Sequence, residues 1–250
     1  MSPFIHCEHT KRTIYKSIGL TLSEVLITLG ILGVIAAITI PGLISNYQKR
    51  VTVTRLKGSY SKLMQAFKAA EDDYGPVTEW ELSSKDATSD FWGVYKSSIS
   101  TMIHERILPY VKVIDDCGLD CPLRRKVRIC RLNGIDCNMG LASGYYTIYL
   151  ADGTSWDFMI DNNAGILSTI KVYIDINGNG RPNIFGKDIF TLRLDQGTSL
   201  YGASSKYRRA DLLKTCRECC SKDAGDYAGD FCGGIIQRDG WVISADYPWK

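Results

Sequence analysis

The sequence predicts an α+β protein, in which a long N-terminal helix packs on a small antiparallel β-sheet and disulfides staple the loops. An unbroken apolar run leads into an amphipathic segment, and a hairpin pattern follows in the second half of the chain. Eight of the nine cysteines fall into two groups of four. With 30 Lys+Arg against 27 Asp+Glu, the net charge of +3 shows no nucleic-acid footprint, and we expect no nucleic-acid requirement.

The helix begins with an apolar run from Leu20 to Ile40, and these 21 residues include one charge, Glu24. About 20 apolar residues suffice for a helix to cross a bilayer core. A secretory signal peptide has a shorter apolar region, of about 7–15 residues, and residues 41–44 do not resemble its cleavage site. The segment before the run is basic, so residues 1–19 are expected in the cytoplasm and the rest of the chain outside it.

After Pro41 the helix is expected to continue with one apolar face and to end near Tyr74, before Gly75-Pro76. From Leu20 to Asp73 it would be about 80 Å long at 1.5 Å per residue. Pro41 is expected to kink it. Its first half is apolar all round and would be embedded, whereas the second half would pack on the sheet. The apolar face consists of Val53, Leu56, Tyr60, Leu63 and Phe67.

The sheet is predicted from a hairpin, in which Tyr145–Leu150 and Ser155–Ile160 flank a turn at Asp152-Gly153. Further β-rich runs cover 167–174 and 188–194, which gives about four strands. Short helices are expected at 90–95 and 98–108. The segment from Cys117 to Cys137 is expected to be a stapled loop with its basic run, 124–128, on a solvated face. Residues 196–250 are expected to be an irregular, cysteine-stapled region whose terminal aromatics cap the core.

The cysteines predict disulfides, because the head is expected outside the cytoplasm. Pairing only within the two groups would leave nine arrangements. Cys219 and Cys220 are adjacent and are not expected to bond to each other. The alternative is a zinc site, since Cys216-x-x-Cys219 has ligand spacing. The candidate cysteines are Cys117, Cys121, Cys130, Cys137, Cys216, Cys219, Cys220 and Cys232.

One loop has a pattern that resembles a calcium site. Residues 175–180 read D-x-N-x-N-G, which places oxygen side chains at alternate positions and a glycine at the sharp turn. The twelfth position is Gly186, where an EF-hand has a bidentate Glu. The candidate calcium ligands are therefore Asp175, Asn177, Asn179 and Asp188. The alternative is a tight connection without metal, because Asn, Asp and Gly favour turns by themselves.

The N-terminal segment resembles the type IV prepilins and the pseudopilins of type II secretion. In that family a basic leader ends in Gly, a short apolar-Thr-Leu-x-Glu stretch follows, and about 20 apolar residues come next. Gly19 would end the leader, Leu20 would begin the mature chain, and Glu24 matches the family's Glu. Gly33 and Pro41 stand where the family has its helix-loosening residues. The resemblance covers residues 11–55 and some pseudopilins also bind calcium in a loop between strands.

The resemblance implies that a prepilin peptidase cuts between Gly19 and Leu20 and methylates the new amine of Leu20. Glu24 would then face the N-terminal amine of a neighbouring subunit. Assembly would require other pilin-like subunits, membrane lipid and an inner-membrane platform. The expected parts are a leader (1–19), a transmembrane and filament-core helix (20–41), its amphipathic continuation (42–75) and a head outside the cytoplasm (76–250).

Three functions remain open from the sequence. The first is a structural subunit of a type IV pilus or a related filament, anchored in the inner membrane and then assembled in the periplasm or on the cell surface. The second is a pseudopilin of a type II secretion system. The third is a membrane-anchored enzyme or binding protein. No catalytic motif is present, and His104 is the only histidine after the leader, so we expect no enzyme.

Overall fold

The computed structural model describes residues 19, 21–80, 82, 91–135, 137, 141, 144–163, 166–194, 198–203 and 207–249. The chain forms two compact units, which comprise residues 1–46 and 47–250. The first contains the start of a long helix, and the second contains its remainder and the whole sheet. The expected leader, apart from Gly19, lies outside the described residues, as does Leu20.

The helix α1 spans Leu22–Tyr74, so the prediction of a single long helix with a stop before Gly75-Pro76 is confirmed. It continues through Pro41. Gly75 adopts a φ of +79°, which suits a residue without a Cβ after a helix end. In the first unit, the threonine hydroxyls of the apolar run are satisfied within the helix. Thr28 and Thr39 donate to the carbonyls of Val25 and Ile35, both at 2.9 Å.

The sheet has six antiparallel strands in sequence order, where about four were expected. The additional strands are the two edge strands. The first begins before the cysteine-rich segment 117–137, which is expected to be a loop, and runs into its start, and the last has only three residues. The strands are β1 (Val113–Leu119), β2 (Tyr146–Leu150), β3 (Ser155–Asn163), β4 (Ile166–Asp175), β5 (Ile189–Leu194) and β6 (Thr198–Leu200).

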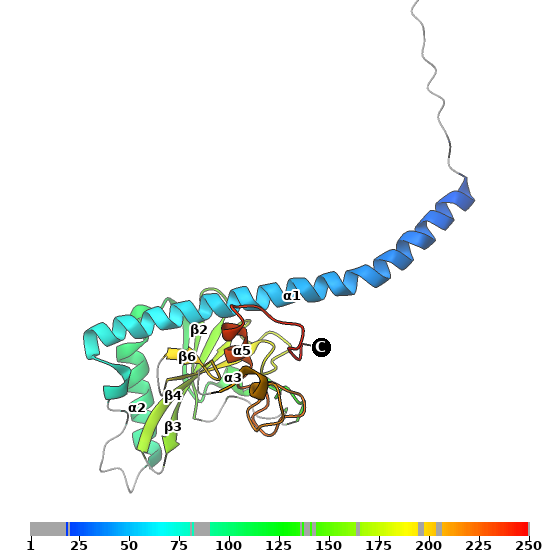
Figure 1. The fold of residues 1–250 in the computed structure, drawn as a ribbon. Coiled ribbons are helices and arrows are strands. Elements are labelled where there is room, and N and C mark those ends of the chain that lie inside the picture. Colours follow the sequence, from blue (N-terminus) through cyan, green and yellow to red (C-terminus); the bar gives the residue numbers. More distant parts are fainter. Residues whose placement is uncertain are drawn as a thin grey trace, which may run out of the picture. The chain divides into compact units, whose positions relative to one another are not determined.

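One face of the sheet packs against the second half of α1 (Figure 1). The strand registers align four fully buried side chains in a row across β2 to β5: Ile148, Trp156, Ile174 and Phe190. The indole Nε1 of Trp156 donates to Ser59 Oγ of α1 at 2.6 Å, so the buried N–H has a partner. Of the predicted apolar face of α1, the side chains fully buried in this core are Leu56, Leu63 and Phe67.

The opposite face of the sheet carries polar residues that are also buried. Thr147, Asp157, Tyr173 and Thr191 form the corresponding row. A second, smaller apolar cluster covers this face, and its members come from the chain between α3 and β2 and from the β4–β5 loop as well as from the strands. They are Ile129, Leu141, Tyr173, Phe185 and Ile189. Both faces of the sheet are therefore covered, and polar groups on the second face need partners inside the protein.

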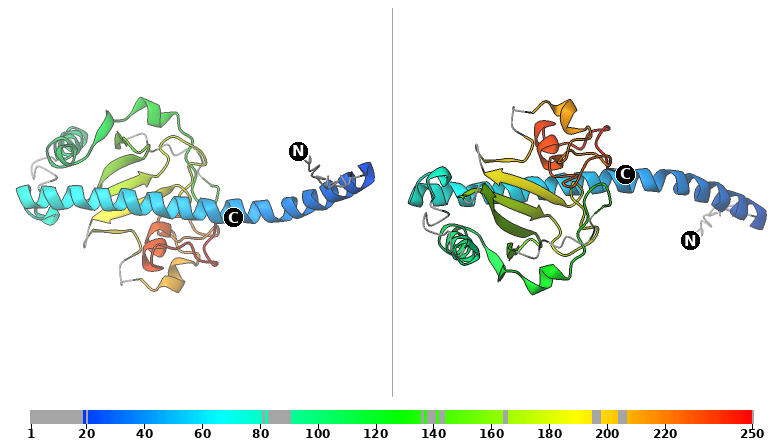
Figure 2. Two further views of the ribbon diagram at one scale, coloured as in Figure 1. Left: turned by 90° about the horizontal axis from the view of Figure 1, so that it is seen from above. Right: turned by 90° about the horizontal axis from the view of Figure 1, so that it is seen from below.

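Short elements complete the head, and α2 and α5 flank α1 on opposite sides (Figure 2). The two helices expected at 90–95 and 98–108 are one helix, α2 (Phe91–Arg106), which is followed by a 3-10 turn, η2. The C-terminal region has more regular structure than expected. Tyr247 is buried and Trp241 and Trp249 pack on the main core, so the predicted capping of the core is confirmed. The remaining elements are η1 (Val77–Glu79), η2 (Leu108–Tyr110), α3 (Pro122–Arg125), α4 (Arg209–Leu212) and α5 (Cys232–Arg238).

Candidate functional site

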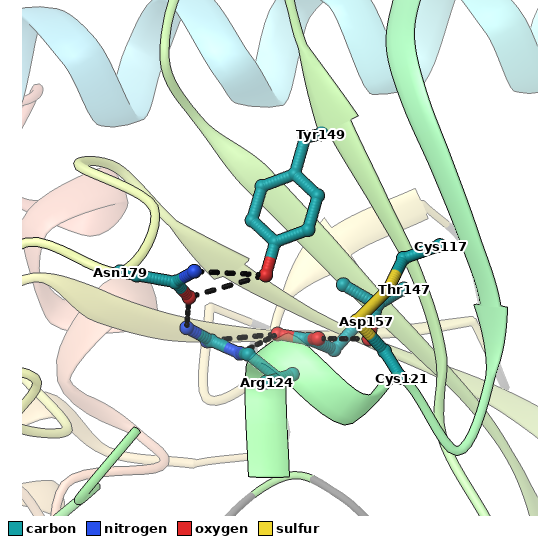
Figure 3. The surroundings of a disulfide bond; sticks show 7 residues. All are labelled: Cys117, Cys121, Arg124, Thr147, Tyr149, Asp157 and Asn179. Carbon is teal, nitrogen blue, oxygen red and sulfur yellow. Dashed lines mark hydrogen bonds and ion pairs between the residues drawn. A yellow bond between two sulfur atoms is a disulfide. The ribbon is translucent and has the colours of Figure 1, made fainter. Parts of the chain in front are cut away.

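The second face of the sheet is organised around Arg124, a fully buried arginine on the short helix α3 (Figure 3). Its Nε and Nη2 donate to Oδ2 of Asp157 at 3.1 and 2.9 Å. Its Nη1 donates to Oδ2 of Asp175 at 2.8 Å. Asp157 and Asp175 lie on the same face of neighbouring strands, β3 and β4, and both are fully buried. One cation therefore lies between two carboxylates in the interior of the head.

A second layer of hydrogen bonds surrounds this ion cluster. Thr147 donates to the other oxygen of Asp157 at 2.7 Å. Arg124 Nη1 also lies 3.3 Å from the carbonyl of Gly178 and from Oδ1 of Asn179. Tyr149 and Asn179 contact each other side by side, with the amide Nδ2 donating to the phenol oxygen at 3.0 Å (Figure 3). Buried charges require such hydrogen-bond partners, and the charged groups of this cluster have them.

A disulfide holds the short helix in place. Cys117 of β1 bonds to Cys121, which is the residue before the first helical residue, Pro122. Between them the chain reverses through Gly118 and Asp120, which have φ angles of +77° and +58°. The bond therefore closes the turn from β1 into α3.

The basic run 124–128 was expected on a solvated face, and this prediction is wrong for Arg124. Arg125, Lys126 and Arg128 are exposed, as expected. A helix of four residues directs successive side chains to different sides, so one of the two adjacent arginines faces the sheet. The signal that could have identified it is the pair of acidic residues, Asp157 and Asp175, within strands that are otherwise buried.

Burial of the cluster makes one carboxylate titrate near neutrality. Desolvation raises the pKa of Asp175 to about 7, although the Arg124 charge opposes the shift, and the nearby Asp188 charge adds to it. Desolvation also raises the pKa of Asp157. One cation cannot neutralise two carboxylates, and a proton on Asp175 leaves Arg124 paired with a single charge.

Head stability is expected to fall as the pH rises from about 4 to about 7. The pKa of Asp175 is higher in the folded state than its ordinary value of 3.8, so the folded state binds the proton more strongly in this window. Chemical denaturation of the oxidised chain at several pH values measures the slope. Asp175→Asn removes this titration, so we expect a flatter profile. An unchanged slope in that variant would contradict the assignment.

The predicted calcium loop is arranged partly around Arg124. Asp175 and Asn179 contact the guanidinium, whereas Asp188 accepts the backbone N–H groups of Asn183 and Ile184, both at 2.6 Å. The amide of Asn177 donates to Asp188 at 3.4 Å. Within the described part of the chain, no group of three or more His, Cys, Asp or Glu side chains could hold a metal ion. Calcium at this loop stays a prediction.

All eight candidate cysteines form disulfides, which confirms the prediction of disulfides, and each pair lies within one of the two groups. Cys219 and Cys220 bond to different partners, as expected. Both candidate zinc groups are therefore used in disulfides, and the zinc alternative is not supported by the structure. The pairs are Cys117–Cys121, Cys130–Cys137, Cys216–Cys219 and Cys220–Cys232.

The N-terminal residues predicted to be functional lie at the beginning of α1. Gly19 is exposed, and Leu20 is outside the described residues. Glu24 lies in the first turn, where its Oε2 accepts the backbone N–H of Thr21 at 2.8 Å and the Thr21 hydroxyl at 2.9 Å. The N–H of Glu24 lies 3.3 Å from the same hydroxyl. This reciprocal arrangement is a capping box, which the sequence T-x-x-E could have predicted.

The fold defines a chain with one apolar N-terminal helix and a disulfide-stapled α+β head. The helix α1 is long and apolar enough to cross a membrane. Residues 42–250 match a family described as a family of unknown function, DUF6613, and the chain belongs to that family. The match begins directly after Pro41 and so leaves out the N-terminal apolar run. No curated protein and no solved structure matches this chain.

Proposed function

We propose that this protein is a pilin-like structural subunit of a type IV pilus or a related filament. In this proposal a prepilin peptidase cuts the chain between Gly19 and Leu20 and methylates Leu20. The observation that carries the proposal is the division of α1. Its apolar run ends in an amphipathic continuation that packs on an antiparallel sheet, and the run itself has no partner within the described part of the chain.

The exposed apolar run is more stable in an apolar environment than in water. Most large side chains along it are about half exposed or more, for example Leu22 at 78%, Val34 at 62% and Ile38 at 74%. Burying one such side chain contributes about 1.5–3 kcal/mol, so a run of this length strongly favours an apolar environment. Lipid provides that environment before assembly, and the same run from neighbouring subunits would provide it in a filament. A plain membrane anchor would need only the lipid.

Glu24 is the feature that a plain anchor explains least. A carboxylate within an apolar helix costs several kcal/mol in lipid unless it is paired or close to the interface. Its two hydrogen bonds to Thr21 both fall on Oε2. We propose that the carboxylate pairs with the N-terminal amine of the next subunit, as the resemblance to prepilins implies.

The disulfides support a head outside the cytoplasm more strongly than the charges do. Three cations, at positions 11, 12 and 16, precede the apolar run. Four follow it closely, at positions 49, 50, 55 and 57, so the charge bias alone does not determine the orientation. Four disulfides form and persist in an oxidising compartment, which favours the periplasmic side.

The chemistry of the head gives little support to an anchored enzyme. His104 lies on α2 with its Nε2 at 2.9 Å from the hydroxyl of Tyr146, which also donates to Asp116 at 3.0 Å. Desolvation, followed by the Asp116 interactions, raises the pKa of Tyr146. An activated nucleophile would need the opposite shift. This contact is better explained as an attachment of α2 to the sheet.

The first test is the intact mass and N-terminal sequence of the protein from its native membrane. We expect a chain that begins at N-methyl-Leu20, and we expect Gly19→Ala to retain the leader. The mass gain on reduction counts the disulfides in the same sample. A wild-type chain that still begins at Met1 beside an active prepilin peptidase would reduce the N-terminal segment to a simple anchor.

A further inference from the structure

A hollow of about 500 Å³ lies on the side of the 176–188 loop that faces α1. Its helix wall runs from Tyr47 to Arg55, and its loop wall includes Arg181 and Lys187. Trp249, from the end of the chain, completes the lining. All of these residues belong to the second unit of the chain, and Arg124 is not among them.

The hollow is lined by three cations and a single carboxylate, Asp188. Arg55, Arg181 and Lys187 line it, and in the part of the chain that the structure describes, none of the three forms a salt bridge. Partial burial lowers the pKa of Lys187, and the neighbouring charge of Lys222 lowers it further. An anion bound here would offset both of these costs.

The one carboxylate of the lining is directed into its own loop. Both oxygens of Asp188 accept backbone N–H groups, at 2.6 Å from Asn183 and 2.6 Å from Ile184, and the residue is only 3% exposed. Desolvation raises the pKa of Asp188, and these donors oppose that shift. The charged side chains of the lining are therefore three cations and one carboxylate whose two oxygens are already hydrogen-bonded within the loop. Tyr47 and Trp249 add two aromatic rings to its lining.

We propose that this hollow binds a phosphate group between Arg55, Arg181 and Lys187. Two guanidinium groups offer planar donor pairs that match phosphate oxygens, and an ammonium adds a point charge. Either a phospholipid headgroup or a free phosphate has this chemistry. Tyr47, which lines the hollow, follows Ile40, the last residue of the apolar run, by only seven positions in the sequence, and this favours a headgroup. The choice of a headgroup over free phosphate rests on the proposed function, whereas the phosphate site itself does not.

The test uses the full chain in a neutral detergent, titrated by calorimetry with inorganic phosphate in one arm and with dihexanoyl phosphatidylglycerol in the other. We expect saturable binding of at least one probe, and the tighter probe identifies the source. Arg181→Gln and Lys187→Gln are each expected to weaken it at least tenfold. Arg128→Gln, which removes an exposed cation outside the hollow, serves as the matched control and should leave the affinity unchanged.

Binding of neither probe would overturn the proposal, as would binding that survives both substitutions or falls equally in Arg128→Gln. Circular dichroism of each variant confirms that the fold is retained, which is expected because Arg181 is exposed and Lys187 is only half-buried. Leader processing is measured on the same samples. A processed chain that binds neither probe overturns the phosphate site alone, whereas a chain that binds phosphate but is never processed overturns the filament proposal alone.

Discussion

Replacing Arg124 by methionine is expected to destabilise the head by about 3–5 kcal/mol. The substitution keeps an apolar stem of similar length but leaves Asp157 and Asp175 buried without their cation. Removing one partner of a buried ion cluster is costly because the remaining charge cannot return to water. Chemical denaturation of the oxidised chain at pH 8, where Asp175 is mostly charged, measures the loss.

The neighbouring Arg125→Met is the matched control, because that side chain is 52% exposed and lies 3.5 Å from Asp120. Exposed ion pairs contribute about 0–1 kcal/mol, so a small effect is expected. The deficit of Arg124→Met should shrink at low pH, where both carboxylates can take up protons. Equal losses in the two variants, or a deficit that does not vary with pH, would show that the cluster is not the cause.

Glu24→Gln is expected to abolish filament assembly while the chain remains in the membrane. Glutamine can replace glutamate in a capping box, so the contacts to Thr21 and the beginning of α1 are retained. Only the negative charge is lost, and with it the proposed pairing to the amine of the next subunit. Electron microscopy of sheared filaments, together with membrane fractionation, measures both results.

Glu24→Val and Thr21→Val separate the charge from the cap. Glu24→Val removes both and should also prevent assembly. Thr21→Val keeps the charge and weakens the cap, at a cost of about 1 kcal/mol to the helix, so filaments should still form. Normal filaments from Glu24→Gln but not from Glu24→Val would show that Glu24 acts as a helix cap and has no charge partner.

The long helix and the central hairpin could be predicted from local patterns, since their side chains repeat with the period of the element. The α1 stop at Tyr74 and the turn at Asp152-Gly153 were both correct, because a glycine marks each of them. The two edge strands were missed. β1 carries Asp115 and Asp116, and its last three residues belong to the segment 117–137, whose cysteines and glycines indicate a loop. An edge strand is defined by its pairing with a neighbour and has little alternation of its own.

The candidate site was found only in part. The oxygen-bearing side chains of the loop from Asp175 to Asp188 indicate a cation site, and the structure brings a protein cation, Arg124, to two of its residues. Those two residues and the arginine are about 50 positions apart in sequence. No local pattern indicates that one arginine of a basic run is buried, because its burial depends on which strand residues lie opposite it.

The sequence by itself determined where this protein can enter a membrane, where its helix ends and which cysteines group together. These properties depend on the composition and the short-range periodicity of one segment at a time, so the sequence of that segment is enough to determine them. Only the tertiary structure decided the pairing of the cysteines, the burial of Arg124 and the collection of three cations in one hollow. Each of these depends on distances between segments that are remote in sequence, and the energy of a charge depends on what surrounds it after folding.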